Sequence, residues 1–260
     1  MAQRQASVKA SLTAIMALAA FFVAAGSAAA QTDLSAYAKA EAAAAADGTT
    51  TRSHGWEVRY GIAGGTGGAS IAGAPLERLI GKAESFAVDL FKWKDEASGE
   101  NRLLGVGEAH GLFAVDPESA AAVVLDYPNL KAISPRAREA KVIESSASRW
   151  YVYEDIGINF MGISIGYKLD AETWREALPN GAIGIRSRLT KSHDGKLYAA
   201  DASWYFRKIQ LGGVSYTYIR TWSTSGLRNP GVGVAGVMKL FTAGELRDQV
   251  NAVGQLAGKR

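Results

Sequence analysis

Aromatic side chains gather in the second half of the sequence, in stretches with the composition of β-strands. Within Val214–Ser223, Tyr216, Tyr218, Arg220 and Trp222 share one face, because strand side chains alternate. We predict an aromatic wall for an apolar ligand, with Arg220 meeting a headgroup or carboxylate. The residues predicted to contact the ligand in this wall are Tyr151, Tyr153, Trp204, Phe206, Tyr216, Tyr218, Arg220 and Trp222.

The alternative for these aromatic residues is cross-strand packing, with Arg220 facing water. If Arg220 is buried instead, it needs an acidic partner. Asp201 and Asp155 are the acids available on neighbouring predicted strands.

The three histidines, His54, His110 and His193, lie far apart in sequence. No two have the spacing of metal ligands on a helix, so we expect no metal site, and we expect no cofactor. His110 lies on a predicted strand, where it either faces a cavity as an acid or base or is a plain strand residue. No serine stands in a G-x-S-x-G motif, and the absence of cysteine excludes disulfides, thiolate metal sites and cysteine nucleophiles. We therefore predict no catalytic residue.

A glycine-rich loop and a cluster of basic residues are two further patterns in the sequence. Gly64–Ala69 has the letters of a dinucleotide-binding loop, but the preceding Trp56–Tyr60 is too charged for a strand buried on both faces. We expect a flexible loop there. A basic cluster, formed by Lys131, Arg136, Arg138 and Lys141, would attract anionic lipid headgroups at a cavity rim, or would be a solvated face balanced by neighbouring glutamates.

The N-terminal residues predict export. Arg4 and Lys9 precede an apolar run over Leu12–Ala25, and small residues follow up to Ala30. The run has about 14 residues, fewer than the ~20 that span a bilayer, so residues 1–30 are predicted to be a cleaved signal peptide rather than an uncleaved anchor. We expect a soluble periplasmic or secreted protein.

The charge balance and the lack of cysteine bear on possible partners and on the source of stability. The chain of 260 residues has 29 basic and 25 acidic side chains, and removal of Arg4 and Lys9 with the signal peptide leaves 27 against 25. Such a small excess gives no electrostatic reason to expect nucleic acid as a partner. Without disulfides, stability must come from a hydrophobic core.

The order of predicted elements follows from periodicity and turn residues. Thr32–Ala46 is alanine-rich and helical, Trp56–Ile62 is a short strand, and Pro75–Ala83 is a short helix. Asp116 and Pro117 open another helix as N-cap and first residue. Strands are expected at Ser85–Trp93, Leu103–Val115, Ala140–Glu144, Trp150–Ile158, Met161–Leu169, Ala182–Thr190, Leu197–Lys208 and Val214–Ser223.

The remaining segments are predicted to be turns, loops and a C-terminal helix. Ala171–Leu178 reads as a helical turn or loop, Asp194-Gly195 as a hairpin turn, and Gly226–Gly236 as loose chain. Val237–Leu256 has the three-and-four spacing of an amphipathic helix. We expect an α+β domain over residues 85–260, preceded by an Ala/Gly-rich segment over residues 31–84.

The central motifs resemble the START-like or helix-grip superfamily of lipid-binding domains, including its polyketide cyclase branch. The stretches that carry this resemblance are Phe113–Glu118, Val124–Asn129, Ile133–Pro135, Val142–Glu144 and Trp150–Tyr153. The resemblance implies a curved antiparallel sheet of about seven strands that grips a long C-terminal helix, with two short helices after the first strand and an internal cavity for a hydrophobic ligand.

From this resemblance we expect a binding protein rather than an enzyme. It would hold a lipid or other hydrophobic molecule in its cavity, as a periplasmic lipid carrier with transient membrane contact. One alternative is a cyclase or aromatase-type enzyme, with His110, a cavity tyrosine or Arg220 acting on the bound molecule. Another is an interaction module with a filled core.

Overall fold

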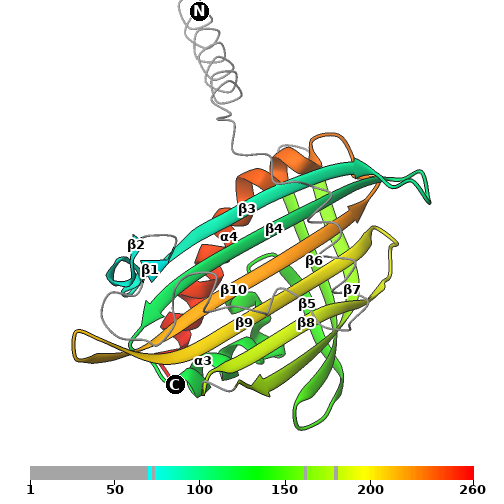
Figure 1. Ribbon diagram of the computed structural model, residues 1–260. Coiled ribbons are helices and arrows are strands. Elements are labelled where there is room, and N and C mark those ends of the chain that lie inside the picture. The colour runs from blue at the N-terminus through cyan, green and yellow to red at the C-terminus, as the bar shows by residue number, and fades with distance from the viewer. Residues whose placement is uncertain (1–69, 72–73, 161–162, 179–180) are drawn as a thin grey trace, which may run out of the picture. The chain divides into compact units, whose positions relative to one another are not determined.

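Within the described part of the chain, eight antiparallel strands form one sheet that curves around the C-terminal helix (Figure 1). The computed structural model describes residues 70–71, 74–160, 163–178 and 181–260. The sheet order is β3-β4-β10-β9-β8-β7-β6-β5. The strands are β3 (Ala83–Lys94), β4 (Asn101–Phe113), β5 (Ala137–Ser145), β6 (Arg149–Phe160), β7 (Ile163–Ala177), β8 (Ile183–Ser192), β9 (Leu197–Leu211) and β10 (Val214–Arg228). The predicted α+β helix-grip fold is confirmed.

The remaining elements are short, except for the last helix. β1 (Ser70–Ile71) pairs with β2 (Ala74–Pro75) in a separate small sheet, and η2 (Leu76–Leu79) is one turn of 3₁₀ helix within the predicted Pro75–Ala83 helix. The predictions for the signal peptide, Thr32–Ala46, Trp56–Ile62 and Gly64–Ala69 lie outside the described residues.

Two short helices follow β4, which is the second strand of the sheet rather than the first. In α3 (Pro117–Val124) the Asp116 carboxylate accepts hydrogen bonds from the backbone N–H groups of Glu118 and Ser119, at 2.9 and 3.2 Å. The predicted N-cap is therefore present, with Pro117 at the first helical position. η3 (Tyr127–Ala132) is a kinked 3₁₀ helix that leads into β5.

The prediction for Ala171–Leu178 is wrong, because β7 continues to Ala177. Three of the eight residues in this stretch are charged, and each has a partner of opposite charge elsewhere in the fold. Glu172 binds Arg149 and Arg188, Glu176 pairs with Arg186, and Arg175 pairs with Glu118 of α3. The start of the predicted loose segment is also strand, since β10 runs to Arg228.

The C-terminal helix α4 (Val234–Ala257) packs on one side of this sheet, here named the helix side. Leu246, Val250 and Val253 of α4 form a buried cluster with Ala109 of β4 and Ile219 of β10. Of the predicted apolar stripe, Val237, Leu246, Val250 and Val253 are buried, Phe241 and Leu256 are half-buried, and Leu240 is 63% exposed. No helix within the described ranges is both long and apolar enough to cross a bilayer.

The opposite side of the sheet, here named the outer side, has its own apolar cluster. Leu76 and Leu79 of η2 pack there against Leu112, Tyr205 and Tyr218. Because neighbouring residues of a strand point to opposite sides, Ile219 faces the helix while Tyr218 and Arg220 face outward.

Candidate functional site

A cavity of about 290 Å³ lies between the helix side of the sheet, η3 and α4. Its wall is predominantly apolar, with Ile156, Ile165, Leu169 and Ile185 from the strands and Leu246 from α4. This volume is near the lower end of the range for small-molecule sites. A cavity is therefore present where it was predicted, between the sheet and the C-terminal helix, and it is partly open to solvent.

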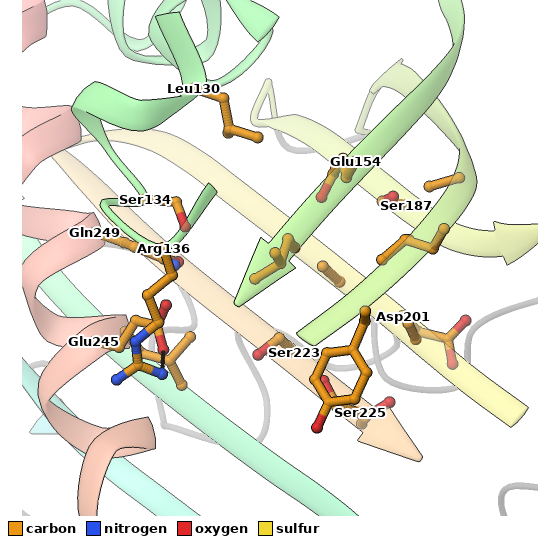
Figure 2. Close-up of a pocket in the computed structure, with 18 of the residues that line it drawn as sticks. Leu130, Ser134, Arg136, Glu154, Ser187, Asp201, Ser223, Ser225, Glu245 and Gln249 are labelled. Carbon is orange, nitrogen blue, oxygen red and sulfur yellow. Dashed lines mark ion pairs between the residues drawn. The ribbon is translucent and has the colours of Figure 1, made fainter. Parts of the chain in front are cut away.

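One ion pair lies on the α4 side of the cavity (Figure 2). The Arg136 guanidinium contacts the Glu245 carboxylate of α4, with the two side chains 21% and 19% exposed, and it also lies 5.0 Å from the centre of the Phe241 ring. Burial raises the pKa of Glu245, while the positive charge of Arg136 opposes that shift. The cation of Arg136 is thus already matched by an acid.

Glu154 of β6 is a second acidic group on the cavity wall (Figure 2). Burial raises the pKa of its carboxyl to about 7. Among the described residues, none donates a hydrogen bond to this carboxyl or forms an ion pair with it. A carboxyl in an apolar pocket without a cation is expected to hold its proton near neutral pH.

Two hydroxyl groups also reach the cavity. Thr173 of β7 is 2% exposed, and its Oγ1 makes no hydrogen bond of normal geometry with a described residue, although the Tyr127 hydroxyl lies close enough to interact with it. Tyr127 of η3 is buried near it. Burial raises the pKa of Tyr127 above its usual value, the Thr173 hydroxyl opposes that shift, and the charge of Glu154 adds to it. The cavity therefore combines an apolar wall with a few convergent polar groups.

Of the eight predicted ligand-binding residues, Trp204 alone lines this cavity. Phe206 stacks on Trp204 with ring centres 6.2 Å apart, within the core beneath α4. Tyr151 donates to Glu172 over 3.3 Å, and Tyr153 packs edge-on against His193. Tyr216, Tyr218, Arg220 and Trp222 alternate with Ile219 and therefore face the outer side. Ligand contact by these residues stays a prediction.

The outer side holds a buried polar network. Arg220 Nε contacts the Glu108 carboxylate, and His110 Nε2 lies 3.5 Å from the same carboxylate. His110 Nδ1 is 2.5 Å from the Tyr218 hydroxyl. All four side chains are at most 1% exposed. The acid in contact with Arg220 is thus Glu108 of the neighbouring strand β4, which was not among the predicted partners Asp201 and Asp155.

Two of the three histidines and part of the basic cluster contact other side chains. His110 faces the outer side and does not line the cavity. His193 lies in the β8–β9 turn, where its Nε2 is 2.8 Å from an Asp170 oxygen. In the basic cluster, Arg136 pairs with Glu245 and Lys141 with Glu139. Within the described ranges, no three histidine, cysteine or acidic side chains form a group able to hold a metal ion.

Sequence reasoning missed Glu154, Thr173 and Tyr127. The available signal was alternation: Val152, Glu154 and Ile156 occupy every second position of β6, so an acid interrupts an apolar face. A lone acid on such a face is unusual, because burial of an unpaired carboxylate is costly.

Several solved structures are similar to this chain. A STAR-related lipid transfer protein from Xanthomonas axonopodis is 11% identical, with a TM-score of 0.48, over 66% of this chain and 99% of that chain. The human StAR-related lipid transfer protein 5 is 8% identical, with a TM-score of 0.47, over 66% of this chain and 86% of that one. A Streptomyces aromatase/cyclase is 17% identical, with a TM-score of 0.39, over 60% and 93%.

The curved antiparallel sheet and the C-terminal helix packed against it form a helix-grip fold. No protein-family model and no curated protein sequence matches this chain.

Proposed function

We propose that this domain binds a hydrophobic small molecule or lipid in the cavity between its sheet and α4. The observation that supports this proposal is the cavity of about 290 Å³ with its apolar wall. Transfer of apolar surface from water into such a site gains ~25 cal/mol per Å². The few polar groups on the wall would orient the ligand.

The proposal extends to a carrier outside the cytoplasm, in the periplasm or secreted. Its support is the pattern of the first 30 residues, with basic residues, an apolar run and a small-residue cleavage site. Removal of residues 1–30 from the protein recovered from its native cell envelope, detected as the intact mass, would test this part.

Binding can be tested with the neutral dye Nile red, followed by displacement with dodecanol. Ala171 of β7 lines the cavity and is 3% exposed, so Ala171→Leu places extra atoms inside it. We expect this substitution to weaken dye binding by about tenfold or more, since a filled site excludes the ligand. Ala177→Leu, on an exposed position of the same strand, is the matched control and should bind as the wild type does.

Two results would contradict the proposal. One is a wild-type protein that takes up neither dye nor dodecanol and carries no apolar molecule in native mass spectrometry. The other is equal binding by the wild type and Ala171→Leu, which would place the dye elsewhere. Either result would favour an interaction module.

One observation favours the enzyme alternative. The Glu154 carboxyl, with a pKa raised to about 7 by burial, is suited to general acid–base chemistry at neutral pH. His110, the acid or base expected from sequence, does not line the cavity. Conversion of a co-purified ligand by the wild type, lost in Glu154→Gln while ligand binding persists, would support this alternative.

A further inference from the structure

The residues around Glu154 on the helix side of the sheet are apolar. Glu154 lies opposite Leu169 of β7 and Ala140 of β5 in the strand register. Its neighbours two positions away on β6 are Val152 and Ile156. No positive or hydrogen-donating side chain is supplied by these flanking positions.

Asp155, the next residue of β6, has different neighbours from Glu154. Asp155 faces the outer side, where Arg138 Nη1 and Lys168 Nζ lie 3.8 and 3.9 Å from its oxygens. Among the described residues lining the cavity, Arg136 is the only cation, and Glu245 already pairs with it. On the same strand, the outward acid therefore has two cations nearby and the cavity acid has none.

A second observation points to a polar ligand group. The Thr173 Oγ1 is buried at the cavity wall and makes no hydrogen bond of normal geometry with a described residue, although the Tyr127 hydroxyl lies close enough to interact with it. A hydroxyl can donate one hydrogen bond and accept two, so this oxygen can still accept from a ligand even where Tyr127 contacts it. Glu154 and Thr173 thus give the cavity unused hydrogen-bond acceptors on two adjacent strands.

From this geometry we infer that the cavity selects hydrophobic molecules whose polar end donates hydrogen bonds, above all a protonated amine, and that Glu154 accepts from that end. The inference rests on the proposed binding function and names its ligand class. An amine would give Glu154 the positive partner that the protein does not supply, in a charge-assisted hydrogen bond. A carboxylate ligand would instead face an acid in a low-dielectric site, without a free cation on the wall.

The test compares three ligands of one chain length, dodecylamine, dodecanol and dodecanoic acid, as competitors of bound Nile red. Measurements at pH 8, below micellar concentrations and with the full chain, give three affinities each for wild type, Glu154→Gln and Asp155→Asn. Asp155→Asn is the matched control, because it removes a carboxyl from the adjacent, outward position.

We expect the wild type to bind dodecylamine about tenfold or more tightly than dodecanoic acid, with dodecanol between them. Glu154→Gln should lose most of the amine preference while keeping its dodecanol affinity. Asp155→Asn should retain the wild-type order. Retained dodecanol binding also shows that Glu154→Gln is folded.

The outcomes separate the two proposals. If dodecanol binds but dodecanoic acid binds as tightly as the amine, the ligand class is wrong and the cavity function stands. If the amine preference persists in Glu154→Gln, Glu154 is not the accepting residue. If none of the three ligands displaces or replaces the dye, both the proposed function and this inference fail.

Discussion

The buried polar groups on the two sides of this sheet differ in whether they have charged partners within the protein. On the outer side, Arg220, Glu108, His110 and Tyr218 contact one another in a network that is at most 1% exposed. On the helix side, Glu154 and Thr173 face a cavity. Glu154 has no ion pair among the described residues, and the Thr173 hydroxyl makes no hydrogen bond of normal geometry with them, although Tyr127 lies beside it.

This difference suggests separate roles for the two sides. A buried ion pair between Arg220 and Glu108 joins β10 to β4, and each charge of the pair is matched by the other. Polar groups left unsatisfied on a cavity wall cost stability and can regain hydrogen bonds when a ligand binds. The following predictions test whether stability and binding divide between the two sides in this way.

The largest expected effect is on the outer side. Arg220→Met removes one partner of the buried pair and leaves the Glu108 charge without it, so we expect a loss of about 3–5 kcal/mol in the free energy of unfolding. The control is Arg228→Met on the same strand, whose pair with Glu100 is partly exposed and should be worth at most about 1 kcal/mol. Urea denaturation measures both.

The double substitution Glu108→Leu with Arg220→Met sharpens this test. Removing both charges should recover most of the lost stability, because no buried charge remains unmatched. Arg220→Met and Arg228→Met with equal costs would contradict the role given to the outer network.

The second effect concerns pH and the helix side. The folded-state pKa of Glu154 is raised from 4.5 to about 7, so the native state binds more protons than the unfolded state between those values. Its contribution to stability therefore falls as pH rises through this window, by up to about 3 kcal/mol, and stays constant above it. Glu154→Gln should be more stable than the wild type at pH 8 and not at pH 4.5, in urea denaturation at both values.

Asp155→Asn provides the control for this pH effect, because it lies one residue away on the outer side. It should show no gain at pH 8. A Glu154→Gln variant that follows the wild-type stability at every pH would mean that the Glu154 carboxyl is not desolvated by the cavity.

A smaller effect separates two buried tyrosines. Tyr218→Phe removes the hydroxyl beside His110 Nδ1 and should cost about 1–2 kcal/mol in thermal or urea unfolding. Tyr127→Phe, at the cavity wall, should cost less than about 1 kcal/mol while changing ligand affinity. Equal stability losses with no change in ligand affinity would count against the division of roles.

The smallest effect is expected for a threonine pair. Thr173→Val removes a hydroxyl whose contact with Tyr127 lacks normal hydrogen-bond geometry, so stability should change by no more than about 0.5 kcal/mol or increase. Thr217→Val is the control, since the Thr217 hydroxyl donates to the Val115 carbonyl and its loss should cost about 1 kcal/mol. A larger loss at Thr173 than at Thr217 would show that the cavity hydroxyl is already satisfied.

Local features of the fold could be predicted from sequence because they depend on neighbouring residues. Asp116 and Pro117 set the start of α3, Asp194-Gly195 formed the expected hairpin turn with Gly195 at a φ of 67°, and the apolar spacing placed α4. The stretch Ala171–Leu178 was misread because the cations that match its acids come from β6 and β8. Its own sequence therefore resembles an exposed loop.

The sequence by itself determined that Tyr216, Tyr218, Arg220 and Trp222 share one side of a strand. It could not determine which side, because alternation is unchanged when a strand is turned over. That choice was made by α4, which buries Ile219 and its neighbours, and by the pairing of β4 with β10, which brings Glu108 to Arg220 across 112 residues of chain. Only tertiary structure could therefore assign the aromatic face to the outer side and the cavity to Glu154, Thr173 and Trp204.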